Sequence, residues 1–326
     1  VRLGTGLAGG MQDAELLDAL DRLAAGAAPC GLVWGTGFED RPNLLARLAE
    51  RWPLLGNTAD TVKLVKDPMR FAELCASLDV AHPETRLSRP TNLAGWLRKR
   101  QGGAGGSHIR RADASAEGSG FYYQREVAGT PVAALFLAHG GEAVVLGCST
   151  QWCDPTPLQP YRYGGAVRPA PLPPAMHSRL ADAVQRLAAA LPLVGLNSAD
   201  FLLDGSDVWL LEVNPRPGAT LDIFEPPHQS LFALHVAACG GDLPVRAPSL
   251  AGAAASAIVY AQLNIPRLRA THWPDWVSDR PHAGPPIRAG EPLCTVHAIA
   301  ATAAEAKKLV SERLAAMQAL TQASAA

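Results

Sequence analysis

Two acidic residues interrupt an otherwise apolar pair of strand-like segments in the second half of the chain. Residues 198–214 read SADFLLDGSDVWLLEVN, two apolar stretches joined by a Gly-Ser turn, which is the pattern of a β-hairpin. A turn centred on Ser206 places Asp200 opposite Glu212, with Asn214 on the same side. Directly opposed side chains start about 5 Å apart at Cβ. The hairpin therefore predicts two carboxylates and an amide oxygen at one place on apolar strands.

Oxygen ligands of this kind suit a divalent cation. Mg²⁺ takes oxygen ligands at about 2.1 Å and shares them with nucleotide phosphates, and Mn²⁺ accepts a similar set. Neither acid would be stable among apolar side chains without a counter-charge. The alternative is a solvated hairpin with incidental acids, but Glu212 stands in a strand too apolar to face water. We therefore expect Asp200, Glu212 and Asn214 to hold Mg²⁺ or Mn²⁺.

Arg216 lies two residues after Asn214, between Pro215 and Pro217. The two prolines restrict the direction of the backbone at this point. The planar guanidinium of Arg216 can bind a phosphate or a carboxylate at two points. A lone arginine is most often a surface ion-pair partner. Its place beside the acids favours a catalytic role instead, in which it stabilises charge on a transferred phosphoryl group or an oxyanion.

A glycine-rich segment between two strand-like segments provides a second candidate site. Residues 99–107 read KRQGGAGGS, and the Walker pattern GxxxxGK[ST] is absent. A flexible linker is the alternative. We expect a lid over residues 99–110 in which Lys99 supplies positive charge and catalytic assistance. The backbone N–H groups that could close over phosphates belong to Gly103, Gly105, Gly106 and Ser107.

Composition narrows the class of partner. Lys and Arg number 29 and Asp and Glu number 30, so no basic field exists to hold nucleic acid. No apolar run reaches the roughly eighteen residues of a membrane span, and no secretory signal precedes the first helix. The six cysteines lack zinc or disulfide spacing. We expect a cytoplasmic protein with no nucleic-acid or membrane partner, and a homodimer is left open.

The expected elements fall into three parts. Residues 1–60 alternate helices with a short strand at 30–35, as in an open α/β unit, although residues 1–10 are glycine-rich without a clear strand. Residues 61–242 contain antiparallel hairpins, and residues 243–326 form a small β-plus-helix unit. Helices are expected over 12–25, 42–51, 67–78, 175–190, 229–239 and 302–320.

The order of these segments resembles the ATP-grasp superfamily from about residue 55 to 240. The glycine lid, the strand FYYQREV at 121–127 and the segment LLEVNPRPGAT at 210–220 follow in that order, and the C-terminal unit is similar to the biotin-carboxylase-like branch. The resemblance implies an α/β (α+β) fold in which two antiparallel-sheet lobes clasp ATP. It also implies that the preceding α/β domain is short by at least one βα unit. Because the chain begins with Val1 and a glycine-rich segment, we expect either an incomplete N-terminus or a misplaced start.

The resemblance assigns roles to particular residues. Lys99 would contact the α- and β-phosphates, and Arg216 would face an acyl phosphate. The first ATP-contacting lysine of many members appears here as Lys66, with Lys63 and Arg70 as alternatives. The acid that usually binds the ribose falls near Pro131. The hinge whose backbone would read adenine comprises Gln124, Arg125, Glu126 and Val127.

Family members phosphorylate a carboxylate with ATP and let an amine displace the phosphate. The resemblance thus implies an ADP-forming carbon–nitrogen ligase with small-molecule carboxylate and amine substrates, and residues 35–41 and 161–168 are candidate pocket loops. The segments LLGN, KDP, PETR and GGSHIRR are similar to ligases of the tyramine-glutamate type, which serve cofactor synthesis. The alternatives are a nucleotide-binding protein without turnover and a purine-pathway carboxylase-like enzyme.

Overall fold

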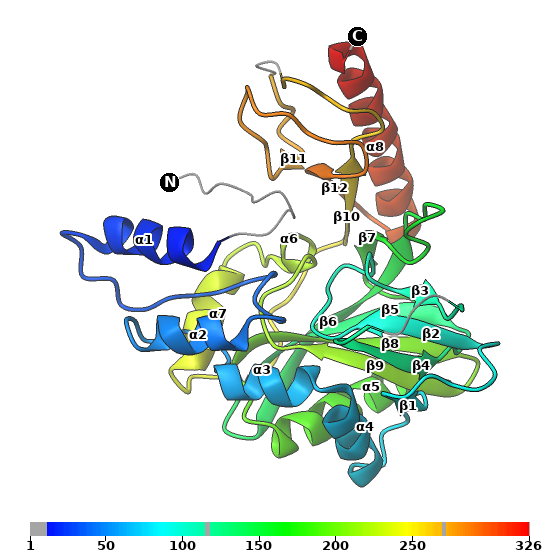
Figure 1. The fold of residues 1–326 in the computed structure, drawn as a ribbon. Coiled ribbons are helices and arrows are strands. Elements are labelled where there is room, and N and C mark those ends of the chain that lie inside the picture. Colours follow the sequence, from blue (N-terminus) through cyan, green and yellow to red (C-terminus); the bar gives the residue numbers. More distant parts are fainter. Residues whose placement is uncertain (1–11, 115–117, 269–271, 326) are drawn as a thin grey trace.

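Two antiparallel sheets organise the structure, a computed structural model that describes residues 12–114, 118–268 and 272–325 (Figure 1). The larger sheet has eight strands in the order β11-β12-β10-β7-β6-β5-β8-β9, and the smaller has four in the order β1-β4-β2-β3. All pairs of named strands are antiparallel. The predicted α+β class with two antiparallel lobes is therefore confirmed. The glycine-rich residues 1–10 lie outside the described residues.

The strands of the two sheets have the following bounds, and β8 and β9 form the hairpin predicted at 198–214. The small sheet comprises β1 (Thr85–Arg86), β2 (Trp96–Arg100), β3 (Arg110–Arg111) and β4 (Phe121–Arg125). The large sheet comprises β5 (Thr130–His139), β6 (Glu142–Cys153), β7 (Tyr163–Arg168), β8 (Gly195–Asp204), β9 (Asp207–Asn214), β10 (Ala253–Tyr260), β11 (Val277–Ser278) and β12 (Pro292–Ala300).

Helices cover both faces of the large sheet. The helices are α1 (Asp13–Ala24), α2 (Pro42–Ala49), α3 (Ala59–Lys66), α4 (Pro68–Ser77), α5 (Pro174–Ala190), α6 (Leu221–Phe224), α7 (Leu231–Cys239) and α8 (Ala303–Ala325). One face packs against α3, α4 and α5, the opposite face packs against α6 and α7, and α8 covers β10 and β12. Because both faces are covered, only part of one face is left for a ligand.

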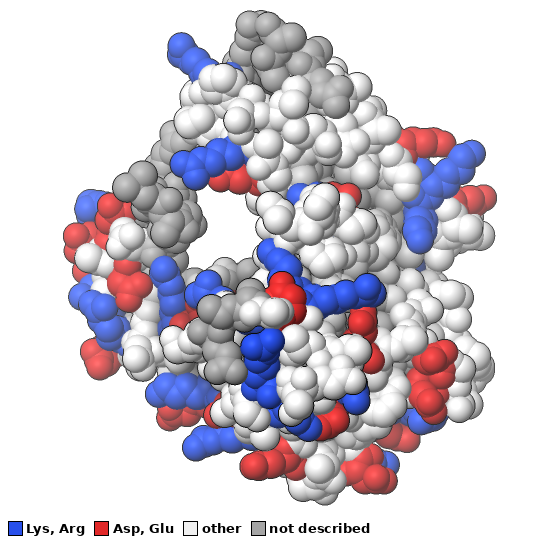
Figure 2. Space-filling model, turned by 45° about the vertical axis from the view of Figure 1, so that its right-hand side comes forward, with Lys and Arg blue, Asp and Glu red and all other residues white. Residues whose placement is uncertain are grey.

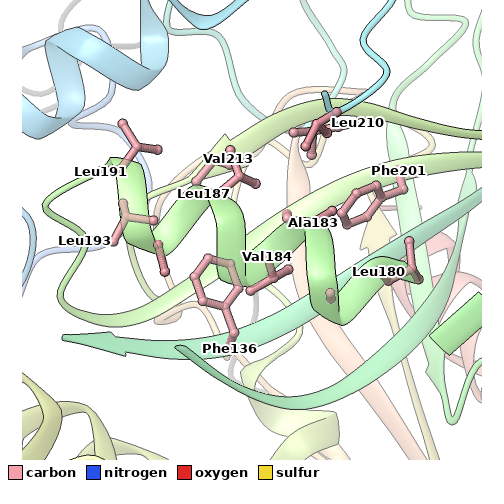
Figure 3. Close-up of a cluster of buried hydrophobic side chains, with 14 of the residues drawn as sticks. Phe136, Leu180, Ala183, Val184, Leu187, Leu191, Leu193, Phe201, Leu210 and Val213 are labelled. Atoms are coloured by element: carbon pink, nitrogen blue, oxygen red, sulfur yellow. The ribbon is translucent and has the colours of Figure 1, made fainter. Parts of the chain in front are cut away.

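The α5 helix shows why its segment folds as it does. Leu180, Ala183, Val184 and Leu187 recur at helical spacing and are buried. They pack against the sheet, where the aromatic rings of Phe136 and Phe201 fill the space (Figure 3). Burying each such side chain contributes roughly 1.5–3 kcal/mol. This core fixes the position of β8 and β9, the hairpin with the two acids.

The strand predicted at 30–35 does not form. Within the described residues, this segment makes one isolated parallel bridge, between Leu32 and Leu54. Leu32 donates its N–H to the carbonyl of Pro53, and Leu55 donates to the carbonyl of Leu32. Pro53 has no N–H group to donate to the facing segment, so the parallel pairing cannot extend past this bridge on the Pro53 side. The N-terminal part is instead held by a small core of α1, α2 and α3 with Trp34.

The part from β10 onward continues the large sheet. β10 pairs with β7, so that Ala254 lies opposite Arg168, across the boundary expected at residue 242. No helix in the described part of the chain has the length and hydropathy needed to cross a bilayer. On the face shown in Figure 2, basic and acidic side chains alternate without a continuous basic field.

Candidate active site

The three side chains expected to hold a metal lie together on β8 and β9. Asp200 is the register partner of Glu212, as predicted, and Ser198 is the partner of Asn214. The Asn214 Nδ2 group donates a hydrogen bond of 2.9 Å to Asp200 Oδ2. The neighbours of Asp200 in β8, Ala199 and Phe201, pack in the α5 core. Alternate strand residues point to opposite faces, so Asp200 points to the uncovered part of the other face.

The turn of this hairpin differs from the prediction. Asp204 pairs with Asp207, so the turn is Gly205-Ser206 and is not centred on Ser206. A β-bulge between Asp200 and Phe201 then adds one residue on β9 and shifts the register. The bulge restores the predicted pairing at the acids.

Lys66 joins this group from the last residue of α3. Its Nζ donates to Glu212 Oε2 at 3.0 Å and to Asn214 Oδ1 at 2.9 Å, and its side chain is only 8% exposed. Among the candidates Lys66, Lys63 and Arg70, the structure brings Lys66 to the acids, whereas Lys63 and Arg70 pair with Asp60 and Asp67 on the outside.

Lys99 approaches from the opposite lobe. It lies on β2, and its Nζ donates to Gln124 Oε1 on the neighbouring β4 at 2.5 Å. Burial lowers the pKa of Lys99 to about 8, although the negative charges of Glu212 and Asp200 oppose this shift. Lys99 therefore lies near both acids, in the cleft between the two sheets.

The acids have opposite pKa shifts. Burial, reinforced by the charge of Glu212, raises the pKa of Asp200. Burial acts in the same direction on Glu212, but the ammonium of Lys66 and then of Lys99 outweighs it, so the pKa of Glu212 is lowered. A carboxylate with too little counter-charge beside an amide oxygen fits a divalent cation. The described residues contain no cluster of three His, Cys, Asp or Glu side chains that could hold a metal ion, so a cation here would need the amide oxygen of Asn214 as a third ligand.

Arg216 is not free in the cleft. Its Nε donates to Glu39 Oε1 at 2.6 Å, and both side chains are almost fully buried. The Glu39 carboxylate also accepts the backbone N–H groups of Gly37 and Phe38 at 2.7 and 3.1 Å. Sequence reasoning missed Glu39, although it placed residues 35–41 beside the pocket.

The lid glycines lie in the connection between β2 and β3. Gly105 accepts a backbone hydrogen bond of 2.9 Å from Tyr163, and an added Cβ at Gly106 would lie 1.9 Å from the carbonyl oxygen of Tyr161. A Cβ at Gly103 would meet the His108 ring, and the carbonyl of Ser107 accepts from Arg110. The segment predicted as a lid thus lies against Tyr161 and the first residue of β7.

The residues predicted as the hinge lie at the end of β4 and directly after it. Gln124 is buried against Lys99, Arg125 donates to the carbonyl of Ala94, and Glu126 accepts from Tyr161 at 2.8 Å. Val127 lies directly after them and is partly buried. The structure therefore brings Gln124 to the charged group and turns the Arg125 side chain away from it.

One cavity adjoins the charged group, and a second is lined by residues that follow Arg216 in the chain. The first, of about 720 Å³, is lined by Glu39, Lys66 and the lid residue Gly102, among others. The second, of about 340 Å³, lies beside Gly218 and includes Tyr163. Both predicted pocket loops, 35–41 and 161–168, contribute to this lining.

Part of the sequence and the architecture both match a known domain family. Residues 68–220 match the ATP-grasp domain family, and the chain has the ATP-grasp fold. Formate-dependent phosphoribosylglycinamide formyltransferase of Burkholderia pseudomallei strain 668 is 39% identical over 103 residues, which are 31% of this chain and 25% of that protein. The chain therefore spans about a quarter of the curated relatives that it matches.

Solved structures similar to the chain include carboxylases and a ribonucleotide synthetase. The biotin carboxylase domain of Hydrogenobacter thermophilus 2-oxoglutarate carboxylase, solved with MgADP, has a TM-score of 0.72 at 14% identity, covering 96% of this chain and 78% of that one. Rhizobium etli pyruvate carboxylase has a TM-score of 0.74 at 17% identity, covering 95% and 33%. N5-carboxyaminoimidazole ribonucleotide synthetase from Thermotoga maritima has a TM-score of 0.65 at 14% identity, covering 91% and 84%.

Proposed function

We propose that the chain is an ATP-dependent carboxylate–amine ligase that forms an amide through an acyl phosphate and releases ADP. The observation that supports this most is the meeting of two acids with two lysines from opposite lobes: Asp200 and Glu212 with Lys66 and Lys99. A triphosphate with its metal needs both signs of charge at one place.

In this proposal Asp200, Glu212 and Asn214 hold Mg²⁺ or Mn²⁺, which when bound would neutralise charge on the phosphate oxygens. Lys66 and Lys99 bind the phosphates from two sides. Each has three N–H donors and uses one or two of them on protein groups, so donors remain for a nucleotide.

Arg216 has the role of a positioned cation beside the reacting carboxyl group. Its Nε is occupied by Glu39 and its Nη1 contacts the carbonyl of Pro217 at 3.2 Å. The pair fixes the guanidinium plane, so the orientation is set before a substrate binds.

The lid and hinge complete the nucleotide site. Backbone groups of Gly103, Gly105, Gly106 and Ser107 would cover the phosphates and exclude water, which would otherwise hydrolyse an acyl phosphate. Backbone groups of the hinge at 124–127 would bind adenine.

The proposal also divides the chain into three domains, at residues 1–60, 61–242 and 243–326. It further includes a cytoplasmic location and a homodimer.

The finer identity of the substrates admits two candidates. The sequence similarity to ligases of the tyramine-glutamate type favours amide formation in cofactor biosynthesis. The matching segment of the formate-dependent formyltransferase and the likeness to the ribonucleotide synthetase favour a small acid, formate or bicarbonate, transferred to an amine in a purine pathway. Binding of nucleotide without turnover is the outcome that would refute both.

A screen of ADP release tests the proposal. Purified chain is incubated with Mg-ATP and pairs of carboxylates and amines, including formate and bicarbonate, and products are identified by mass spectrometry. Glu212→Ala should lower the substrate-dependent rate by roughly 10³-fold or more, because it removes a metal ligand and a partner of Lys66. The matched control is Glu142→Ala, an exposed acid in β6, which should keep the full rate. ADP release that survives Glu212→Ala would contradict the metal assignment.

A further inference from the structure

His82 lies where the two sheets meet, between α4 and β1. Its Nδ1 is 2.7 Å from the carbonyl oxygen of Leu210 in β9, and Leu210 in turn donates its N–H to the carbonyl of Ala81 at 2.9 Å. The ring of Phe71 packs edge-on against the imidazole, with 5.4 Å between centroids. These contacts hold the imidazole at a fixed place on the large sheet.

The contact with Leu210 determines which ring nitrogen has the proton. A carbonyl oxygen can only accept, so His82 Nδ1 must be the donor. In the neutral ring, Nε2 is then an acceptor. Burial lowers the pKa of His82 to about 4, and the charge of Lys99 acts in the same direction, against the hydrogen bond to Leu210. The neutral ring is therefore the state at physiological pH.

The acceptor at His82 Nε2 in turn orients the amide of Gln124. The Gln124 Nε2 group lies 3.3 Å from His82 Nε2 and 3.3 Å from Thr85 Oγ1. The Thr85 hydroxyl lies 3.2 Å from His82 Nε2 and 2.9 Å from the carbonyl oxygen of Pro83. Donation along the shorter contact, to Pro83, leaves His82 Nε2 and the Thr85 oxygen as acceptors for Gln124. Two acceptors on one side require the NH₂ end of the amide there.

The opposite end of the amide must then face Lys99. Gln124 Oε1 accepts from Lys99 Nζ at 2.5 Å, and both side chains are buried. A reversed amide would point N–H donors at the ammonium, and a donor left without an acceptor in a buried place is costly. The position of the proton on the His82 ring thus determines how the Gln124 amide is oriented. The orientation of this amide in turn determines which of its atoms faces Lys99.

We propose that His82 is a positioning residue for Lys99: its unprotonated Nε2 holds the Gln124 amide so that the carbonyl end receives the ammonium. The inference rests on the proposed function, in which Lys99 binds the nucleotide phosphates. His82 does not touch the nucleotide in this scheme. Without it, the amide can rotate, and the ammonium loses a charge-assisted hydrogen bond that fixes its place.

Two substitutions separate this role from a plain anchoring role. In His82→Asn the side-chain amide reaches the place of Nδ1, so the donor to Leu210 is kept and the acceptor for Gln124 is lost. In His82→Gln the amide reaches the place of Nε2, so the acceptor for Gln124 is kept and the bond to Leu210 is lost. The positioning role predicts that the Asn variant is impaired and the Gln variant is close to wild type. An anchoring role predicts the reverse.

Two measurements compare these variants with the wild type: nucleotide affinity and the rate of lysine labelling. Calorimetry with Mg-ADP should give a Kd raised roughly tenfold in His82→Asn, as expected for loss of one charge-assisted hydrogen bond, and raised less than about threefold in His82→Gln. Pulse labelling with acetic anhydride, read by mass spectrometry without nucleotide, should show faster modification of Lys99 in His82→Asn only. The exposed Lys308 is the internal reference for reactivity, and His177→Asn on the surface of α5 is the matched control variant.

The outcomes are decisive in both directions. Equal labelling and equal affinity in His82→Asn and wild type would overturn the proposal, as would a larger loss in the Gln variant than in the Asn variant. Labelling of Lys99 does not require turnover. If no substrate pair releases ADP but labelling responds as expected, the ligase proposal fails while the positioning of Lys99 by His82 stands.

Discussion

The buried pair of Glu39 and Arg216 offers a test of how the N-terminal part supports the site. The perturbation is Glu39→Gln, which keeps the shape and removes the charge. The Gln amide oxygen can still accept the N–H groups of Gly37 and Phe38, so its NH₂ end is turned toward the Arg216 Nε–H. The variant therefore places a donor against a donor at a site where both side chains are almost fully buried.

The magnitude follows from the burial. The Glu39 side chain is 1% exposed and that of Arg216 is 8%, so solvent screens the pair little. Removing one partner of a buried pair leaves the other charge uncompensated and costs about 3–5 kcal/mol. The carbonyl of Pro217 retains one contact with Arg216, so the lower part of this range, about 3 kcal/mol, is expected.

The assay is urea unfolding at pH 7, followed by circular dichroism and tryptophan fluorescence. A double-mutant cycle with Arg216→Gln separates the pair from other contacts, and a coupling energy of at least about 1.5 kcal/mol is expected. Burial alone would raise the pKa of Glu39, but Arg216 lowers it. The stabilisation is thus present above the ordinary carboxyl pKa and is lost as pH falls through the lowered value. A Glu39→Gln variant within about 0.5 kcal/mol of wild type at pH 7 would refute the reasoning.

Two further predictions concern the cleft. Because the pKa of Lys99 is lowered to about 8, its ammonium is lost as pH rises above that value, and Mg-ADP affinity measured by calorimetry should fall between pH 7 and 9. Lys99→Arg, which stays charged, should remove this pH dependence, and an unchanged slope would contradict the role of Lys99. Gly106→Ala should lower substrate-dependent ADP release roughly tenfold or more, because its Cβ would collide with the carbonyl of Tyr161 at 1.9 Å. Gly105→Ala, which has a similar positive φ but open space around it, is the matched control, and equal losses in both would disprove the steric account.

Local patterns predicted the hairpin well because both of its determinants are local. The alternation of apolar residues and the Gly-Ser turn lie within seventeen residues, and they determine which side chains face each other. The bulge after Asp200 has no such local signal, so the predicted turn centre was wrong although the acid pair was right. A bulge depends on how β9 fits its neighbours in the folded sheet.

Residues that act through distant partners escaped prediction for a physical reason. Glu39 and Arg216 are 177 positions apart, and His82 and Leu210 are 128 apart. A single acid or histidine in a loop belongs to no periodic sequence pattern from which its partner could be predicted. The strand at 30–35 failed in a related way, since its composition favoured a strand but its neighbour contained Pro53, which cannot complete a ladder.

The position of Lys66 connects the metal ligands with the nucleotide. Its ammonium contacts Glu212 and Asn214, two of the three groups assigned to a divalent cation, and so supplies the counter-charge that these oxygens need. A cation and an ammonium cannot both hold the same lone pairs at full strength. On the proposed function, the oxygens of Glu212 and Asn214 would hold a divalent cation, and the Lys66 ammonium would then be available to donate to the nucleotide phosphates. Before a nucleotide binds, the Lys66 ammonium therefore offsets the charge of the Glu212 carboxylate, which lowers the cost of keeping that acid in a buried place.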